Sequence, residues 1–172
     1  MLDANHSEIE LEYWRKIVVF EDNIGNIILK NLTINRVENE HKALDLLMTG
    51  NFTRHVSSTP MNLASSRSHA IFSIIIEGRE LNSEIIRASK INLVDLAGSE
   101  RIKSGNIDMS MFNETKYINL SLSFLEQVIS ALNDKKTGSR AHIPYRNSLM
   151  TTILKDSLGG NCKTVYLLIK LF

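Results

Sequence analysis

The segment best suited to chemistry is Ile91–Gly98, where an apolar run ends in Asp95 and Gly98 follows after two further residues. An aspartate at the end of a buried strand can hold Mg²⁺ through water. A glycine lets the backbone approach a phosphate closely because it has no Cβ. Hydrolases that cleave nucleotides use such a pair at the γ-phosphate. The alternative is ordinary turn chemistry, since Asp and Gly are also common turn residues.

A second polar segment, Asn62–His69, precedes an apolar run that begins at Ala70. Its serine hydroxyls can ligate Mg²⁺ or position a water, and Arg67 offers a planar fork of donors that fits a carboxylate. The alternative is a solvated serine-rich loop. These two segments are therefore the candidate catalytic residues.

Basic residues without acidic neighbours mark a third segment, Lys135–Lys155. The whole chain has 20 basic and 19 acidic residues and a net charge of +1, so this asymmetry is local. It favours an acidic protein partner bound through a salt-sensitive surface. A solvated loop and helix face is the alternative. Nucleic acid is a weaker candidate, because no aromatic residues are interleaved for base stacking.

Composition narrows the remaining classes of protein. The 172 residues are 43% hydrophobic, which suits one packed domain. The single cysteine, Cys162, excludes an internal disulfide and a multi-cysteine zinc site and fits a reducing compartment. The five histidines share no metal-ligand spacing. No run is apolar and long enough for a transmembrane helix, so we expect no membrane partner.

The elements that must position these residues alternate between strands and helices. Two short strands around Gly25 predict a hairpin. Apolar residues that recur at helical spacing predict a long helix over Asn113–Leu132. A second helix is expected to begin at Pro144 and to end at Gly159. The full set of expected elements is strands Ile17–Phe20, Ile27–Leu29, Ala70–Glu77, Arg87–Asp95 and Thr164–Leu171, with a further helix Asn39–Met48 that Gly50 ends. This pattern indicates an α/β fold in one domain, with ligands at the carboxyl ends of strands.

Five sequence motifs together resemble the kinesin motor domain. Asn62–His69 is similar to the switch I motif NxxSSRSH, and Leu93–Arg101 matches the switch II motif LVDLAGSER. The others are similar to the family's INKSL, HIPYR and DSLGGN motifs and lie at Ile118–Leu122, His142–Arg146 and Asp156–Asn161. The resemblance extends from about Leu11 to Phe172 and implies a mostly parallel central sheet flanked by helices, of the P-loop nucleotide hydrolase type.

The resemblance implies a role for each matching residue. Ser65 and Ser66 would lie at the γ-phosphate and Mg²⁺ of ATP, Asp95 would support Mg²⁺, and Gly98 would sense the γ-phosphate. Arg67 and Glu100 would form the salt bridge that closes the site. By the same resemblance, Asn62 would be a further catalytic residue and Ser68 a further cofactor-binding residue of this site. The implied partner is tubulin in the microtubule, contacted by Arg101, Lys103, Lys135, Lys136, Arg140, His142, Tyr145 and Arg146.

The sequence departs from the family in three places. No GxxxxGKS or GxxxxGKT phosphate loop occurs in the 172 residues, so we expect the amino-terminal strands of the sheet to be missing and the chain alone to be an inactive ATPase. Leu120 replaces the lysine of INKSL, and Leu149 with Met150 replaces Lys-Leu. These last two changes resemble the kinesin-nine subfamily, which is associated with cilia and flagella.

Three functions remain open from the sequence. The chain is part of a microtubule-stimulated ATPase motor, a non-catalytic microtubule-binding module, or a fragment without function. The first implies a location in the cytoplasm on microtubules, with the cilium or flagellum as the subfamily's location. Dimerisation would require regions outside these 172 residues.

Overall fold

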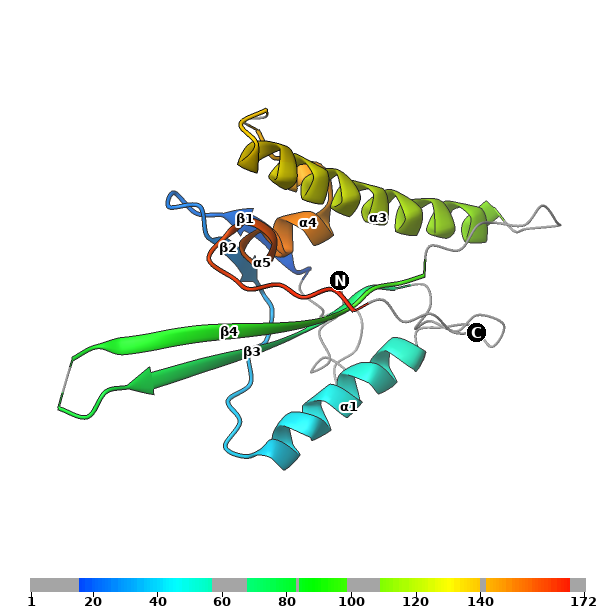
Figure 1. Ribbon diagram of the computed structural model, residues 1–172. Helices are drawn as coiled ribbons and strands as arrows, with labels where there is room; N and C mark the ends of the chain where they lie inside the picture. The colour runs from blue at the N-terminus through cyan, green and yellow to red at the C-terminus, as the bar shows by residue number, and fades with distance from the viewer. Residues whose placement is uncertain (1–15, 57–67, 83, 99–108, 140–141, 168–172) are drawn as a thin grey trace. The chain divides into compact units, whose positions relative to one another are not determined.

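A computed structural model describes residues 16–56, 68–82, 84–98, 109–139 and 142–167 (Figure 1). The chain forms two compact units. Among the described residues, the hairpin unit contains residues 16–32 and everything from 109 onward, and the switch unit contains residues 33–98. Each unit is described by itself, and the single domain expected from the sequence stays a prediction.

The hairpin unit begins with strands β1 (Val18–Glu21) and β2 (Ile27–Lys30), which pair antiparallel. The turn forms because the Asp22 carboxylate accepts hydrogen bonds from the backbone N–H groups of Ile24, at 2.9 Å, and Asn26, at 2.7 Å. Gly25 completes the turn at φ +92°, a conformation that favours glycine. The predicted hairpin is confirmed.

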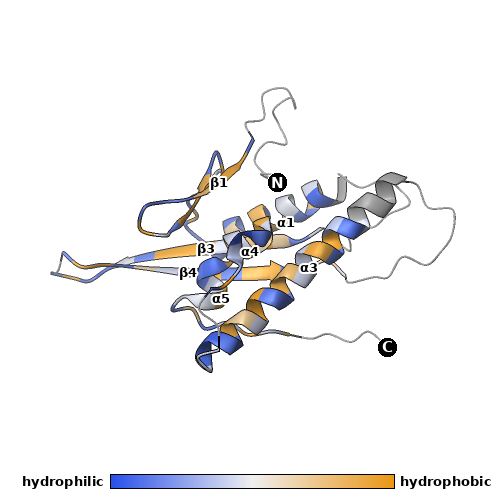
Figure 2. Cartoon of the chain, turned by 90° about the horizontal axis from the view of Figure 1, so that it is seen from above, coloured by the Kyte–Doolittle hydropathy of each residue, from blue (hydrophilic) through white to orange (hydrophobic). Residues whose placement is uncertain are grey.

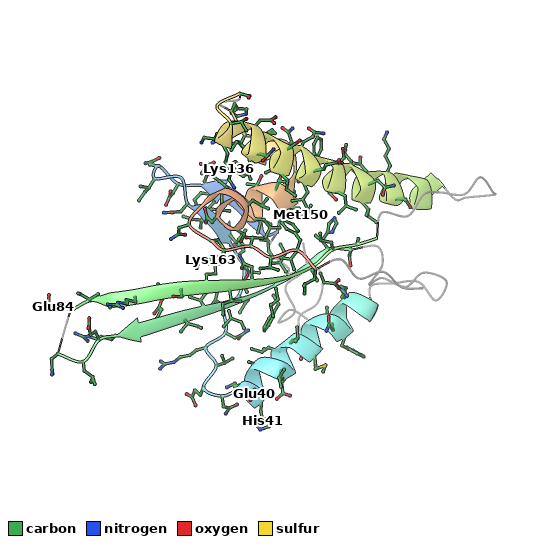
Figure 3. All side chains as sticks on the ribbon, viewed as in Figure 1. Glu40, His41, Glu84, Lys136, Met150 and Lys163 are labelled. Carbon is green, nitrogen blue, oxygen red and sulfur yellow. The ribbon has the colours of Figure 1, made fainter. Side chains whose placement is uncertain are left out.

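Helix α3 (Met109–Lys136) forms the long element of this unit. Leu125, Val128 and Ala131 are buried at intervals of three residues and give the helix one covered stripe. They form the core of the unit together with Met150 and Leu154, and Figure 3 labels Met150 on α4. The predicted helix over Asn113–Leu132 is confirmed and is longer at both ends.

The continuous helix predicted after Pro144 is wrong. A 3₁₀ turn, η3 (Tyr145–Asn147), is followed by two short helices, α4 (Leu149–Ile153) and α5 (Lys155–Gly159). Ser148 interrupts the helix because its extended backbone caps α4, with a reciprocal capping box to Thr151. The fully buried Thr151 hydroxyl also donates to the Tyr145 carbonyl at 2.6 Å.

The switch unit contains the hairpin of strands β3 (Ala70–Arg79) and β4 (Ile86–Asp95), in antiparallel register with Ala70 opposite Asp95. Isoleucine recurs along both strands, and β4 also contains leucine and valine. Figure 2 shows these apolar residues as orange on both strands. Several of these side chains, including Ile75, Ile76 and Leu93, are exposed within the described chain. The two predicted strands are confirmed.

Helix α1 (Glu40–Val56) completes the switch unit. Asn39 precedes its first residue, and the Asn39 side chain accepts a hydrogen bond from the Lys42 N–H at 2.9 Å in the manner of an N-cap. The predicted end at Gly50 is wrong, and the helix continues for almost two more turns. A glycine inside a helix costs only about 1 kcal/mol, which tertiary contacts can outweigh.

Two expectations for the sheet are not met within the described residues. Both strand pairs are antiparallel, and no parallel pair occurs in the part of the chain that the structure describes. β3 and β4 are consecutive and joined by a short turn, which permits only antiparallel pairing. Residues 164–167 form no strand, and residues 168–171 of that predicted strand lie outside the described ranges. None of the described helices is long and apolar enough to cross a membrane.

Candidate functional site

The Asp95 carboxylate lies at the carboxyl end of β4, as predicted, and it is held by an arginine of the same unit. Arg54 Nη1 and Nη2, from the last turn of α1, each donate to Asp95 Oδ2 at 3.0 Å. The Asp95 side chain is 66% exposed, whereas that of Arg54 is 16% exposed. Among the described residues no hydrogen bond reaches Oδ1, so this oxygen is open to solvent ligands.

Arg54 is a site residue to which sequence reasoning gave no role. Its partner Asp95 lies 41 residues away in the sequence, so no local spacing connects the two residues. Its Nε atom is buried without a hydrogen-bond partner in the described chain. The guanidinium is therefore covered, while its counter-ion faces outward.

His69 connects the beginning of β3 to the residues that follow β4. The Ala97 N–H donates to His69 Nδ1 at 3.0 Å, so Nδ1 must be unprotonated. Burial lowers the pKa of His69, and the negative charge of Asp95 opposes part of that change. Ala97 is buried, and the residue that follows it, Gly98, is exposed.

Several predicted site residues lie outside the described ranges. They are Asn62, Ser65, Ser66, Arg67 and Glu100 of the candidate nucleotide site and Arg101, Lys103 and Arg140 of the candidate partner surface. Ser68 is described as a half-buried residue before β3. The Arg67–Glu100 salt bridge therefore stays a prediction.

In the described part of the candidate nucleotide site, Asp95 would fit Mg²⁺ through a bridging water. Asp95 Oδ1 is a carboxylate oxygen of the kind that Mg²⁺ prefers, and Mg²⁺ keeps several waters when it binds few protein ligands. No group of three or more His, Cys, Asp or Glu residues is arranged to hold a metal among the described residues. Phosphate and water would have to supply most of the ligands.

The basic surface of the hairpin unit gathers five residues of the predicted partner contacts. Lys135 and Lys136 end α3, His142 lies in the following loop, and Tyr145 and Arg146 begin η3. Figure 3 labels Lys136 at this end of α3. A cavity of about 600 Å³ lies here. Its lining consists of Leu132, Lys135, Lys136, His142, Ile143, Tyr145, Lys155, Asp156, Gly159 and Gly160.

Tyr145 is fixed in this cavity by its contact with Gly159. A Cβ added at Gly159 would lie 1.7 Å from Tyr145 Oη and 2.9 Å from Cζ, so only glycine leaves room for the ring. Burial raises the pKa of Tyr145, and the positive charge of Lys155 opposes part of that change. The phenol is therefore neutral at physiological pH and donates or accepts hydrogen bonds.

Glu21 of β1 forms ion pairs with two residues of the basic segment. Arg146 Nη2 donates to Oε2 at 2.9 Å, and Lys155 Nζ donates to Oε1 at 2.7 Å. These hydrogen bonds, first that of Lys155 and then that of Arg146, lower the pKa of Glu21. Lys155 is thus an internal contact of the hairpin unit rather than a free surface cation. Sequence reasoning gave Glu21 no role, and Glu21 lies 125 residues before Arg146.

Comparison with known proteins identifies the family. The kinesin motor domain model matches residues 6–169, so the chain belongs to the kinesin family. It is 47% identical to human kinesin-like protein KIF9 over 146 residues and 42% identical to kinesin-like protein KLP1 of Chlamydomonas reinhardtii over 151 residues. These alignments cover 84% and 87% of the chain.

Solved kinesin structures have the same fold. A KIF14 dimer with AMP-PNP in complex with a microtubule matches 86% of the chain with a TM-score of 0.74 and 37% identity. The Kar3-like motor domain of Ashbya gossypii matches 87% with a TM-score of 0.68 and 36% identity. The partial kinesin motor fold expected from the sequence is confirmed.

The chain spans only part of these relatives. It covers 18% of KIF9 and 19% of KLP1, and 42% of the KIF14 chain and 44% of the Kar3-like chain.

Proposed function

We propose that this chain is part of a kinesin-like microtubule motor and that the basic surface of its hairpin unit binds the acidic surface of tubulin. The observation that carries the proposal is the position of Arg146, 81% exposed beside the cavity that Lys135, Lys136, His142 and Tyr145 line. A related structure, the KIF14 dimer, was solved on a microtubule. Arg101, Lys103 and Arg140 extend the proposed contact.

The switch unit would serve the nucleotide in the same motor. Asp95 would hold a water of Mg²⁺ through Oδ1, and Gly98 would approach the γ-phosphate of ATP. The oriented Asp95–Arg54 pair supports this role, because it fixes the carboxylate without occupying both oxygens. Asn62, Ser65, Ser66 and Ser68 would complete the site, and Arg67 with Glu100 would close it. When bound, Mg²⁺ would neutralise phosphate charge.

The proposed location is the microtubule cytoskeleton of the cytoplasm. The similarity of the chain to KIF9 and to KLP1 supports its assignment to the kinesin-nine subfamily. The cilium or flagellum, the location associated with that subfamily, is the finer proposal. The second candidate function is a microtubule-binding module without ATPase activity. It is favoured by the absence of a GxxxxGKS or GxxxxGKT motif from the 172 residues.

Cosedimentation of the 172-residue chain with microtubules tests the proposed binding. We expect the chain to pellet at low salt and to be released as salt rises, because exposed charges are screened over about 10 Å at 0.1 M ionic strength. A chain that stays in the supernatant at low salt, while its circular dichroism shows a folded protein, would contradict the proposal.

A further inference from the structure

The Glu21 carboxylate is shared by two cations that differ in exposure. The Arg146 side chain is 81% exposed and that of Lys155 is 27% exposed, while Glu21 itself is 22% exposed. Two of these three residues are positive, so the group has a net charge of +1. The carboxylate therefore neutralises part of the basic surface in the unbound chain.

The bond to Arg146 is suited to exchange. Arg146 Nε and Nη2 both donate to the same oxygen, Oε2, at 3.3 and 2.9 Å. No described residue accepts a hydrogen bond from Nη1. Exposed ion pairs are weak, because water and salt compete with them. The Arg146 guanidinium can leave Glu21 for another carboxylate at little cost.

The bond to Lys155 is suited to stay. Lys155 Nζ donates to Glu21 Oε1 at 2.7 Å and to the Gly25 carbonyl at 3.0 Å, so it holds both the strand and the turn of the β1–β2 hairpin. Lys155 is also mostly covered. If Arg146 leaves, Glu21 still has a counter-ion and no uncompensated charge remains.

We propose that Glu21 competes with the acidic partner for Arg146, which changes from Glu21 to a partner carboxylate on binding while Lys155 keeps Glu21 in place. The inference rests on the proposed function, since it names a residue that tunes the affinity of the same surface. Glu21 is then an attenuator of binding. Its removal strengthens binding, a direction that simple loss of structure does not produce.

Microtubule affinity of the 172-residue chain with Glu21→Gln provides the test. We expect affinity to rise about two- to fivefold at low salt, the range that exposed ion pairs span, and the gain to shrink at high salt. Glu80→Gln is the matched control, because Glu80 forms an exposed ion pair with Arg87 at 3.9 Å in the switch unit. It should leave the affinity unchanged.

The same substitution in an Arg146→Ala background shows whether the gain acts through Arg146. The gain should disappear there, because no guanidinium remains to be released. An equal gain in the wild-type and Arg146→Ala backgrounds would mean that only the net charge matters, and it would overturn the proposal. Unchanged or weaker binding of a folded Glu21→Gln chain would overturn it as well. If Glu21→Gln does not fold, Glu21→Asp, which keeps the charge and shortens the reach to Arg146, must bind microtubules more tightly than the wild-type chain. Failure of the wild-type chain to bind would instead remove the proposed function, and this inference with it.

Discussion

At the scale of single residues, the candidate sites depend on charged side chains whose partners are distant in the sequence. Asp95 is oriented by Arg54, and Arg146 is held by Glu21. In both pairs one partner is exposed and the other is mostly covered. The covered partner of each pair fixes the position of the exposed side chain, which stays accessible to solvent.

The Arg54–Asp95 pair predicts a measurable coupling in stability. Asp95→Asn should lower the free energy of unfolding by about 1 kcal/mol, because the covered Arg54 guanidinium loses its counter-ion. The loss stays small because Asp95 is exposed and solvent weakens the ion pair. Arg54→Met in the same chain should recover part of this loss. Urea denaturation of the two single variants and the double variant measures the coupling. Additive losses would mean that the two residues stabilise the chain independently.

His69 predicts a pH dependence of stability. Its pKa is lowered in the folded chain, so the folded state binds fewer protons than the unfolded state below the usual value of 6.5. Stability should be fully present above about pH 6.5 and should fall as the pH drops toward the folded pKa. His69→Gln keeps an acceptor for the Ala97 N–H and does not titrate. Denaturation at pH 7.5 and 5.5 should show a smaller pH effect in that variant, and an identical effect would exclude His69 as the cause.

At the scale of elements, the sequence predicts the helices and strands that contacts between neighbouring residues stabilise. The β1–β2 hairpin follows from Asp22 and Gly25, and strands β3 and β4 follow from their runs of isoleucine, leucine and valine. Helix α3 follows from its apolar spacing. The break at Ser148 was missed because its capping partner is Thr151, not the glutamate or glutamine usual at that position.

The candidate sites were predicted only in part, because sequence patterns report local features and not contacts between distant residues. Motifs located Asp95, Tyr145 and Arg146, because their positions are local features of the sequence. The partners Arg54 and Glu21 lie 41 and 125 residues away, and no spacing rule connects residues at such distances. Their roles became visible only through the fold.

The contact between η3 and α5 predicts that Gly159 tolerates no side chain. Gly159→Ala should destabilise the chain by about 1–3 kcal/mol, because the new Cβ would overlap the Tyr145 ring. Gly78→Ala is the control, since nothing lies within 4 Å of a Cβ added there. Thermal or urea denaturation compares the two variants. Equal stability of Gly159→Ala and Gly78→Ala would contradict the packing described for Tyr145.

At the scale of the whole molecule, binding and catalysis place different demands on the chain. The basic surface lies within one unit and has described contacts. The proposed nucleotide site has a single described carboxylate, Asp95, and the 172 residues contain no phosphate-loop motif. Binding is therefore the activity that these residues support best.

ATP hydrolysis by the 172-residue chain should be absent. Phosphoryl transfer depends on a cradle and a lysine at the β- and γ-phosphates, and the sequence contains no such motif. Phosphate release with and without microtubules should equal that of a protein-free blank. Release that microtubules stimulate and that Asp95→Ala abolishes would contradict this prediction.

Microtubule cosedimentation of two arginine variants tests the central claim most directly. Arg146 and Arg87 are 81% and 78% exposed and each forms an ion pair with a glutamate, so Arg87→Ala is a matched control for Arg146→Ala. If the hairpin unit provides the tubulin surface, Arg146→Ala should weaken binding severalfold at low salt, and Arg87→Ala should pellet like the wild-type chain. Equal pelleting of the wild-type chain and both variants at low and high salt would contradict the assignment of this surface to tubulin.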